Sequence, residues 1–188
     1  MLVFAGAVFA QTPSMSENSY PDNPSAPVVR DNRDLHGKTV ADTKLPRSDR
    51  RFFNQAARLG EKEVTLSRIA AERATNPQVR AFASEMVTAH TAANKELAAL
   101  IRQKGARIDD QDRAIEQREL AKKWSDKKGA DFDEDYLEAI IDAHQDTIDV
   151  LENGADSKDA DIAAYASKLL PTVKAHLAHA EKLEAQVD

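Results

Sequence analysis

The chain contains no cysteine. This absence excludes disulfide bonds, thiolate metal ligands and cysteine nucleophiles. Any metal ion bound by this protein must therefore be held by nitrogen and oxygen atoms, such as those of imidazole and carboxylate side chains.

Glycine, proline and aromatic residues are scarce. The 188 residues include six glycines and seven prolines, and only 5% of them are aromatic. Alanine, leucine, glutamate and lysine dominate instead, which is the composition of helices packed on helices rather than of a β-rich domain. The length is enough for one domain and a tail. We therefore expect an all-α fold with a single core.

A concentrated basic face is also missing. The formal net charge is −6, and lysine runs such as Lys122-Lys123 are short and interrupted. Nucleic acids and anionic membrane surfaces both require clustered positive charge, so we expect neither as the main partner.

Signatures of common catalytic sites are absent as well. The chain has no nucleophile elbow, no phosphate-binding glycine loop and no zinc-protease motif. These absences argue against an enzyme, and against a hydrolase in particular.

The N-terminal region divides into two segments before the folded domain begins. Residues 1–10, MLVFAGAVFA, look like the apolar core and cleavage site of a secretory signal peptide without its basic start. They are too short to span a bilayer; the alternative is an N-terminus that is disordered or packs into the core. Residues 11–47 contain five of the seven prolines and almost no periodic apolar residues, which predicts a disordered tether. We expect export, most simply to the periplasm, of a domain spanning residues 48–188.

Four long helices are predicted within this domain, and a shorter one between the second and the third. Apolar residues recur at helical spacing over residues 49–74, 76–104, 131–154 and 159–187. Residues 108–128 are highly charged with sparse apolar anchors, which indicates a shorter, partly exposed helix in the long connection. Asn76-Pro77 is typical of a helix start and Gly105 of a helix end.

Each long helix carries one polar residue where its apolar face requires a hydrophobic one. These residues are Glu63, His90, His144 and His176. A buried carboxylate is costly unless it is neutralised, hydrogen-bonded or bound to a cation. One interpretation is that the four groups satisfy one another and only fix the packing. The other is a metal site in the bundle core, for which a glutamate and histidines suit Fe, Zn, Mn or Cu.

Helix lengths predict which of the four lie at the same level. Glu63 is ~18 Å before the turn between the first two helices and His90 is ~20 Å after it, so they should be neighbours. His144 and His176 differ in level by about 10 Å on the same arithmetic, which separates the second pair. Tyr136 is closer to the level of His176 and offers it a hydrogen bond. His179, one turn beyond His176, is either an accessory ligand or an exposed histidine.

Several separated sequence patterns resemble one bacterial family, the exported domain of unknown function 4142. The patterns run in this order: Phe53, Ala56-Ala57 and Glu63-Val64; Phe82-Ala83, Met86-Val87, His90, Ala93-Asn94 and Leu97; Phe132-Asp133, Tyr136 and His144; Leu170-Pro171, His176-Leu177 and Ala180. The resemblance implies a ferritin-like antiparallel four-helix bundle with a long crossover, and an envelope location. It implies no activity. Ferritin-like di-iron proteins carry Glu-x-x-His on two helices, and this chain has no such motif, which argues against oxidase or ferroxidase chemistry.

Two functions of different kinds follow from these patterns. The first is an exported bundle that binds a metal ion through Glu63, His90, His144 and His176 and acts in stress protection, with Tyr136 and His179 as accessories. The second is a non-catalytic structural or interaction protein whose buried polar residues fix the packing register. Its partner would be a second copy of the chain or another envelope protein.

Overall fold

The structure, a computed structural model, describes residues 45–108, 110–125, 127 and 129–187. The predicted signal peptide at residues 1–10 and the predicted tether up to residue 44 lie outside the described residues.

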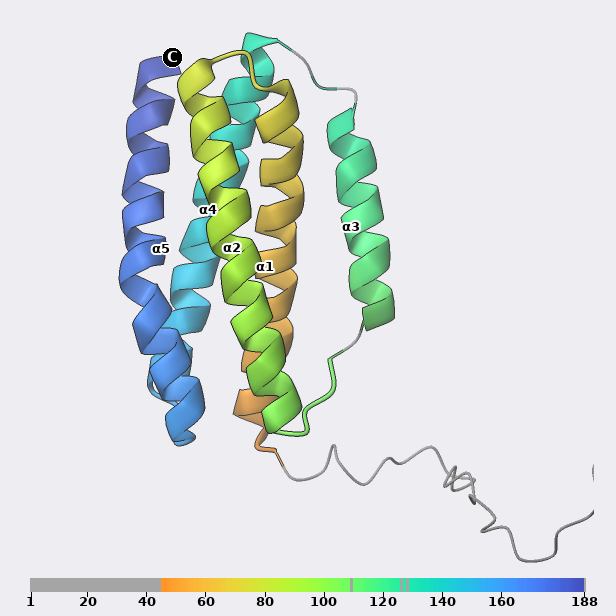
Figure 1. Cartoon of the computed structure of the whole chain (residues 1–188), viewed down its shortest axis with the longest axis vertical. Coiled ribbons are helices and arrows are strands. Elements are labelled where there is room, and N and C mark those ends of the chain that lie inside the picture. Colours follow the sequence, from red (N-terminus) through yellow and green to blue (C-terminus); the bar gives the residue numbers. More distant parts are fainter. Residues whose placement is uncertain (1–44, 109, 126, 128, 188) are drawn as a thin grey trace, which may run out of the picture. The chain divides into compact units, whose positions relative to one another are not determined.

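All regular secondary structure in the described ranges is helical, so the all-α prediction is confirmed. The helices are α1 (Arg47–Arg73), α2 (Pro77–Gln103), α3 (Asp110–Ser125), α4 (Ala130–Ala155) and α5 (Ala160–Val187). The four long ones pack as a helical bundle in which α1 contacts α2 and α4, and α5 contacts α4 and α2 (Figure 1). Each contacting pair runs antiparallel, and the connection from α2 to α4 carries α3 along the length of the bundle (Figure 1).

The predicted start and end of α2 are confirmed at the level of individual hydrogen bonds. The Asn76 side chain accepts a hydrogen bond from the Gln78 backbone N–H at 2.8 Å, with Pro77 at the first helical position. Gly105 follows the helix with φ of 64°, a conformation that costs glycine little. The α1–α2 turn between Arg73 and Pro77 is therefore short, which holds the two helices side by side.

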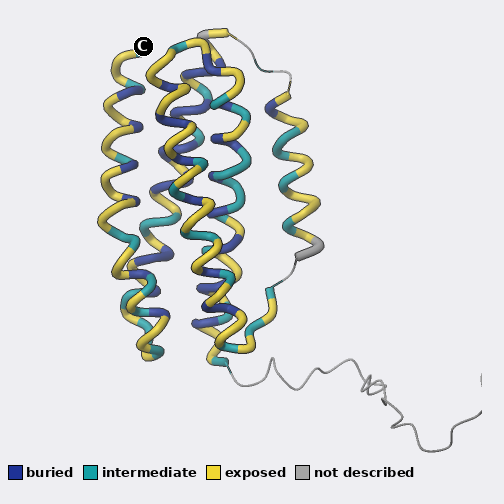
Figure 2. Tube along the Cα trace, in the orientation of Figure 1, coloured by how far each residue is buried: buried dark blue, intermediate teal, exposed yellow. Residues whose placement is uncertain are grey.

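The core consists of two apolar clusters, one nearer each end of the bundle. Figure 2 shows buried residues along the length of the four long helices. The cluster near the α1–α2 turn, called the turn cluster here, includes Leu66, Phe82, Met86, Phe132, Leu137, Ile140 and Leu183. The cluster near the α4–α5 loop, called the loop cluster, includes Phe53, Leu97, Ile101, Leu151, Ile162 and Val173. All four long helices contribute side chains to both clusters, so the bundle buries apolar surface along most of its length.

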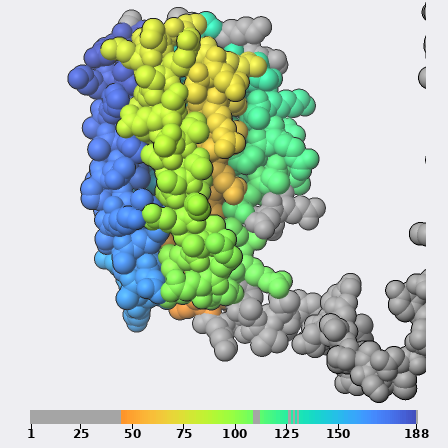
Figure 3. All heavy atoms as spheres, viewed as in Figure 1, coloured from red at the N-terminus to blue at the C-terminus, as the bar shows by residue number. Residues whose placement is uncertain are grey.

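Helix α3 packs outside the four-helix arrangement, against α1 (Figure 3). Its Trp124 ring lies edge-on to Phe132 of α4, with centroids 5.8 Å apart. Two ion pairs also tie it to α1, Arg58–Glu116 at 2.7 Å and Arg113–Glu61 at 2.9 Å. Among the described residues, no helix combines the length and the apolar character needed to cross a bilayer.

Candidate metal centre

Glu63 and the three histidines form one buried polar layer between the two apolar clusters. Glu63 comes from α1, His90 from α2, His144 from α4 and His176 from α5. Their exposed fractions are 0%, 5%, 0% and 8%. On each helix the neighbouring core residues on one side belong to the turn cluster and those on the other side to the loop cluster. The four residues that interrupt the apolar faces in sequence therefore meet at one level in space.

The three imidazole rings lie in a compact triangle. Ring centroids are 5.1 Å apart for His90 and His144, 5.6 Å for His90 and His176, and 5.7 Å for His144 and His176. One ring nitrogen can be chosen from each so that all three lie within 4.8 Å of one another. The triangle thus brings ring nitrogens from three different helices close together.

The predicted separation of His144 from His176 is wrong. Because α4 ends at Ala155 and α5 begins at Ala160, the mismatch in level is only about five residues, or ~7 Å. Side chains of an α-helix lean toward its N-terminus. In this antiparallel pair the His144 ring leans away from the α4–α5 loop and the His176 ring toward it, which brings the two rings to the same level.

The predicted proximity of Glu63 and His90 is confirmed, and Glu63 makes two further contacts, with Thr147 and His144. Glu63 Oε2 lies 2.8 Å from His90 Nδ1, but the pair does not have hydrogen-bond geometry. Glu63 Oε1 accepts a hydrogen bond from Thr147 Oγ1 at 3.1 Å and lies 3.4 Å from His144 Nδ1. Thr147 was not predicted from the sequence, although it follows His144 by three residues on the same helical face. One carboxylate thus contacts α2 and α4 at once.

A backbone hydrogen bond orients His144. Its Nδ1 lies 2.9 Å from the Ile140 carbonyl oxygen, which can only accept, so Nδ1 carries the proton. The lone pair of the neutral ring is then on Nε2, which is buried and has no hydrogen-bond partner. Burial lowers the pKa of His144, an effect that outweighs the opposing attraction of Glu63. A neutral ring held by a carbonyl through one nitrogen, with the other bare, is the arrangement that metal-binding histidines adopt.

Four buried side-chain atoms in this layer that could bind a metal ion have no hydrogen-bond partner. They are Glu63 Oε2, His90 Nε2, His144 Nε2 and His176 Nδ1. Burial, together with the neighbouring His90 and His144, lowers the pKa of His176 to about 4. His176 is therefore neutral at pH 7, and the lone pair of its unprotonated nitrogen is available to a cation. Buried polar groups in folded proteins are nearly always paired, so four unpaired atoms at one place require an explanation.

The donor set suits a divalent transition-metal ion. Three imidazole nitrogens and one carboxylate oxygen are ligands that Zn, Fe, Mn and Cu all accept. Metal–nitrogen bonds of ~2.1 Å place the nitrogens of a tetrahedral site about 3.4 Å apart. One nitrogen from each of the three histidines lies within 4.8 Å of the others, which is at most about 1.4 Å wider than this spacing, and this group does not include Glu63.

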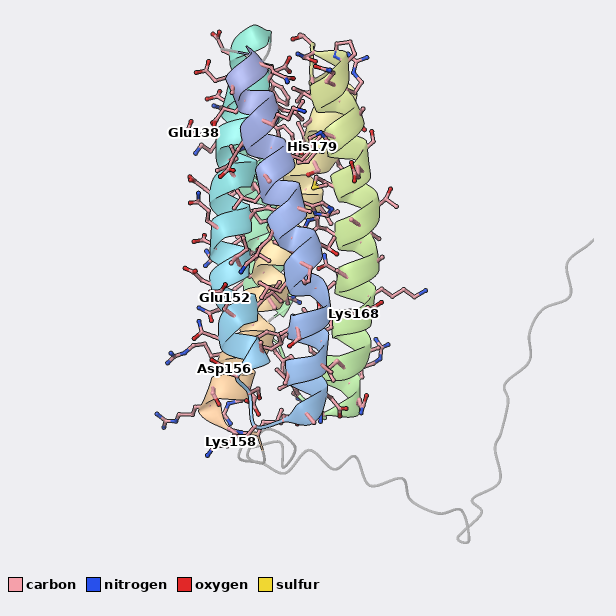
Figure 4. The ribbon with its side chains drawn as sticks, turned by 90° about the vertical axis from the view of Figure 1, so that its left-hand side faces the viewer. Glu138, Glu152, Asp156, Lys158, Lys168 and His179 are labelled. Atoms are coloured by element: carbon pink, nitrogen blue, oxygen red, sulfur yellow. The ribbon has the colours of Figure 1, made fainter. Side chains whose placement is uncertain are left out.

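Tyr136 and His179 are not part of the polar layer. The Tyr136 hydroxyl lies 3.1 Å from Ser67 Oγ, so the predicted hydrogen bond to His176 is wrong. His179 lies on the exposed surface of α5 (Figure 4), with its ring edge-on to Phe82 at a centroid distance of 4.9 Å. Tyr136 lies about two helical turns before His144 on α4, and His179 lies on the exposed side of α5. Neither side chain therefore belongs to the layer.

A small cavity of about 50 Å³ adjoins the layer. Glu63, His90 and His176 line it, together with small or apolar side chains from all four long helices. A cavity of this size is large enough for a water molecule or a small ligand beside a bound ion. His144 is not among the residues that line it.

Comparison with known proteins shows the family. Residues 35–183 match the family described as domain of unknown function, DUF4142. The chain belongs to this family. The resemblance inferred from the sequence is therefore confirmed, and the DUF4142 region includes all four layer residues.

One solved structure is similar to this DUF4142 chain, the crystal structure of a DUF305 fragment from Deinococcus radiodurans. The TM-score is 0.63 with 14% sequence identity, and the similarity covers 75% of this chain and 97% of the fragment. At that identity it shows a shared helical fold alone. No curated protein matches the chain significantly.

Proposed function

We propose that this DUF4142 protein binds one divalent transition-metal ion in its core, with Glu63, His90, His144 and His176 as ligands. The observation that carries the proposal is the set of four buried donor atoms without hydrogen-bond partners. A cation of the Zn, Fe, Mn or Cu class would pair one nitrogen from each histidine, since such nitrogens lie within 4.8 Å of one another, and Glu63, whose Oε2 lies 2.8 Å from His90 Nδ1, would be the fourth ligand. No Glu-x-x-His pair is present, so we propose storage, buffering or sequestration of the ion rather than di-iron oxidation.

We also propose that the bundle is of the ferritin-like type and works in the cell envelope. Two antiparallel hairpins joined by a long connection, with α3 inside it, support the first part (Figure 1). The signal-like stretch at residues 1–10 supports the second. In that compartment, holding a reactive metal ion away from solvent would protect against metal stress.

Metal titration of the protein purified without a histidine tag tests the binding proposal. The wild-type chain should bind one equivalent of Zn²⁺, and His176→Ala should weaken binding by at least about 100-fold through loss of a ligand. His179→Ala is the matched control, since it removes an exposed histidine one turn further along α5. If the two variants bind Zn²⁺ equally well, or the wild type binds none, the proposal is wrong.

A structural role for the layer is the second candidate, and the 2.8 Å contact between Glu63 and His90 favours it. In that case the four groups neutralise one another and maintain the packing register. His90→Leu should then leave the melting temperature unchanged or raise it, with or without metal. If the layer binds metal, the same variant should lose the increase in melting temperature that metal gives the wild type.

A further inference from the structure

We propose that the metal centre takes a small monoanion as an additional ligand, bound in the 50 Å³ cavity beside the polar layer. This inference rests on the proposed metal site and names what the ion would hold. It follows from the charge of the donor set, the walls of the cavity and the surface region next to it.

Glu63 and the three histidines together do not balance the charge of a divalent ion. Metal binding requires a deprotonated carboxylate and neutral imidazoles, so Glu63 contributes one negative charge and the three histidines none. A divalent ion in this set therefore keeps a net charge of about +1. Within the part of the chain that the structure describes, the cavity lining includes no second carboxylate, and burial raises the pKa of its Tyr165, which keeps that phenol neutral. An unbalanced buried charge is costly, and a monoanion removes it.

The walls of the cavity limit the size of that ligand. They include Ala56 and Gly60 of α1, Ala89 and Ala93 of α2, and Thr147 and Leu169 of α4 and α5. Glu63, His90 and His176 border the same space, each more than nine-tenths buried and each with an unpaired donor atom. A space of 50 Å³ accepts a ligand of two or three heavy atoms and excludes a phosphate with its hydration shell.

Asn94 lies beside both this cavity and a larger surface cleft. The cleft has a volume of about 600 Å³, and Asn94 lines both spaces. Its amide packs directly on Gly60, where any Cβ would overlap the amide oxygen. Among the described residues, Arg102, Arg107 and Arg113 line the cleft together with one carboxylate, Glu61, so positive side chains outnumber negative ones there. Positive charge in the neighbouring cleft raises the local concentration of anions.

Azide binding to the copper-loaded protein tests the inference. Cu²⁺ gives a ligand-to-metal charge-transfer absorption with azide, so the wild-type chain should show a saturable band at one azide per copper. Ala93→Leu and Ala89→Leu each fill the cavity from α2 and should weaken azide binding by at least about tenfold. Copper affinity should change by less than about threefold, because neither side chain is a ligand. Ala92→Leu, on the exposed face of the same helix, should leave both affinities unchanged.

A second measurement on the wild-type chain needs no variant. Since binding free energies are reciprocal, saturating azide should tighten copper binding by the factor by which copper tightens azide binding, whereas perchlorate at the same ionic strength should not. If copper binds but azide gives no saturable band, or if both filled variants bind azide like the wild type, the inference is wrong and the metal site stands. If copper does not bind, both proposals fail together.

Discussion

Two buried carboxylates in this bundle have very different surroundings. Asp133, in the first turn of α4, is 2% exposed and accepts three hydrogen bonds from the α1–α2 turn. The donors are the Thr75 backbone N–H at 2.9 Å, its hydroxyl at 2.6 Å and the Asn76 backbone N–H at 2.7 Å. Glu63 is 0% exposed and accepts one hydrogen bond, from Thr147, while its Oε2 has none. Asp133 is thus fully paired by the protein, and Glu63 is not.

The difference separates a structural polar group from a candidate ligand. Asp133 links the start of α4 to the turn between α1 and α2, so its burial is explained by the protein alone. In the Glu63 layer the three imidazole rings already lie close together, but four polar atoms lack hydrogen-bond partners. This combination is expected of a site that binds a ligand. The predictions below test this contrast, from the largest expected effect to the smallest.

Asp133→Ala should destabilise the protein most, by about 3 kcal/mol, because it removes three hydrogen bonds to a buried carboxylate that join the start of α4 to the α1–α2 turn. Urea unfolding measures the loss, and Asp131→Ala, an exposed aspartate in the same turn, is the control. An equal effect of the two substitutions would show that the pairing of Asp133 does not stabilise the fold.

Metal should stabilise the wild-type protein by about 2.7 kcal/mol at a free concentration of 100 times its Kd. Glu63→Leu should abolish this gain. It should change the free energy of unfolding of the metal-free protein little, because several polar atoms of the layer already lack hydrogen-bond partners. Thermal unfolding with and without Zn²⁺ measures both effects. The Asp133→Ala variant should retain the metal-dependent gain, and loss of that gain there would remove the contrast between the two carboxylates.

Metal-free protein should lose stability as the pH falls from 6.5 toward 4. Over this range His176 takes up a proton in the unfolded chain but not in the folded one, whose pKa is about 4. Stability from this source is present above pH 6.5 and decreases below it, by about 2 kcal/mol after allowance for solvent screening. Unfolding in urea at several pH values should show a shallower dependence for His176→Ala and the wild-type dependence for His179→Ala.

Ser67→Ala should have the smallest effect, about 1 kcal/mol, because it leaves the buried Tyr136 hydroxyl without its partner. Tyr136→Phe added to Ser67→Ala should recover part of that loss, since both polar groups are then gone. Denaturant melts of the two variants and the double variant measure this coupling. Zn²⁺ affinity should not change in any of them, and a clear change would mean that this pair supports the metal centre.

The helices and the layer residues could be predicted because both depend on local spacing. An α-helix repeats every 3.6 residues, so the apolar pattern identifies the inward face and any polar residue on it. Glu63, His90, His144 and His176 were found in this way, whereas the N-cap at Asn76 and the C-terminal glycine at Gly105 were predicted from the residue types typical of helix ends. The Glu63–His90 contact was also predictable, because a short turn sets the level of both residues.

The rest depended on contacts between distant segments. The level of His144 against His176 is set by the path of the α4–α5 loop and by the opposite lean of side chains on antiparallel helices, neither of which the spacing within one helix contains. The Tyr136–Ser67 and Thr147–Glu63 hydrogen bonds and the pairing of Asp133 likewise join helices far apart in the chain. The sequence by itself determined which side chains face the core, because helical periodicity is local. Only the tertiary structure decided which of them meet, because the relative heights of packed helices are set by loops and packing together.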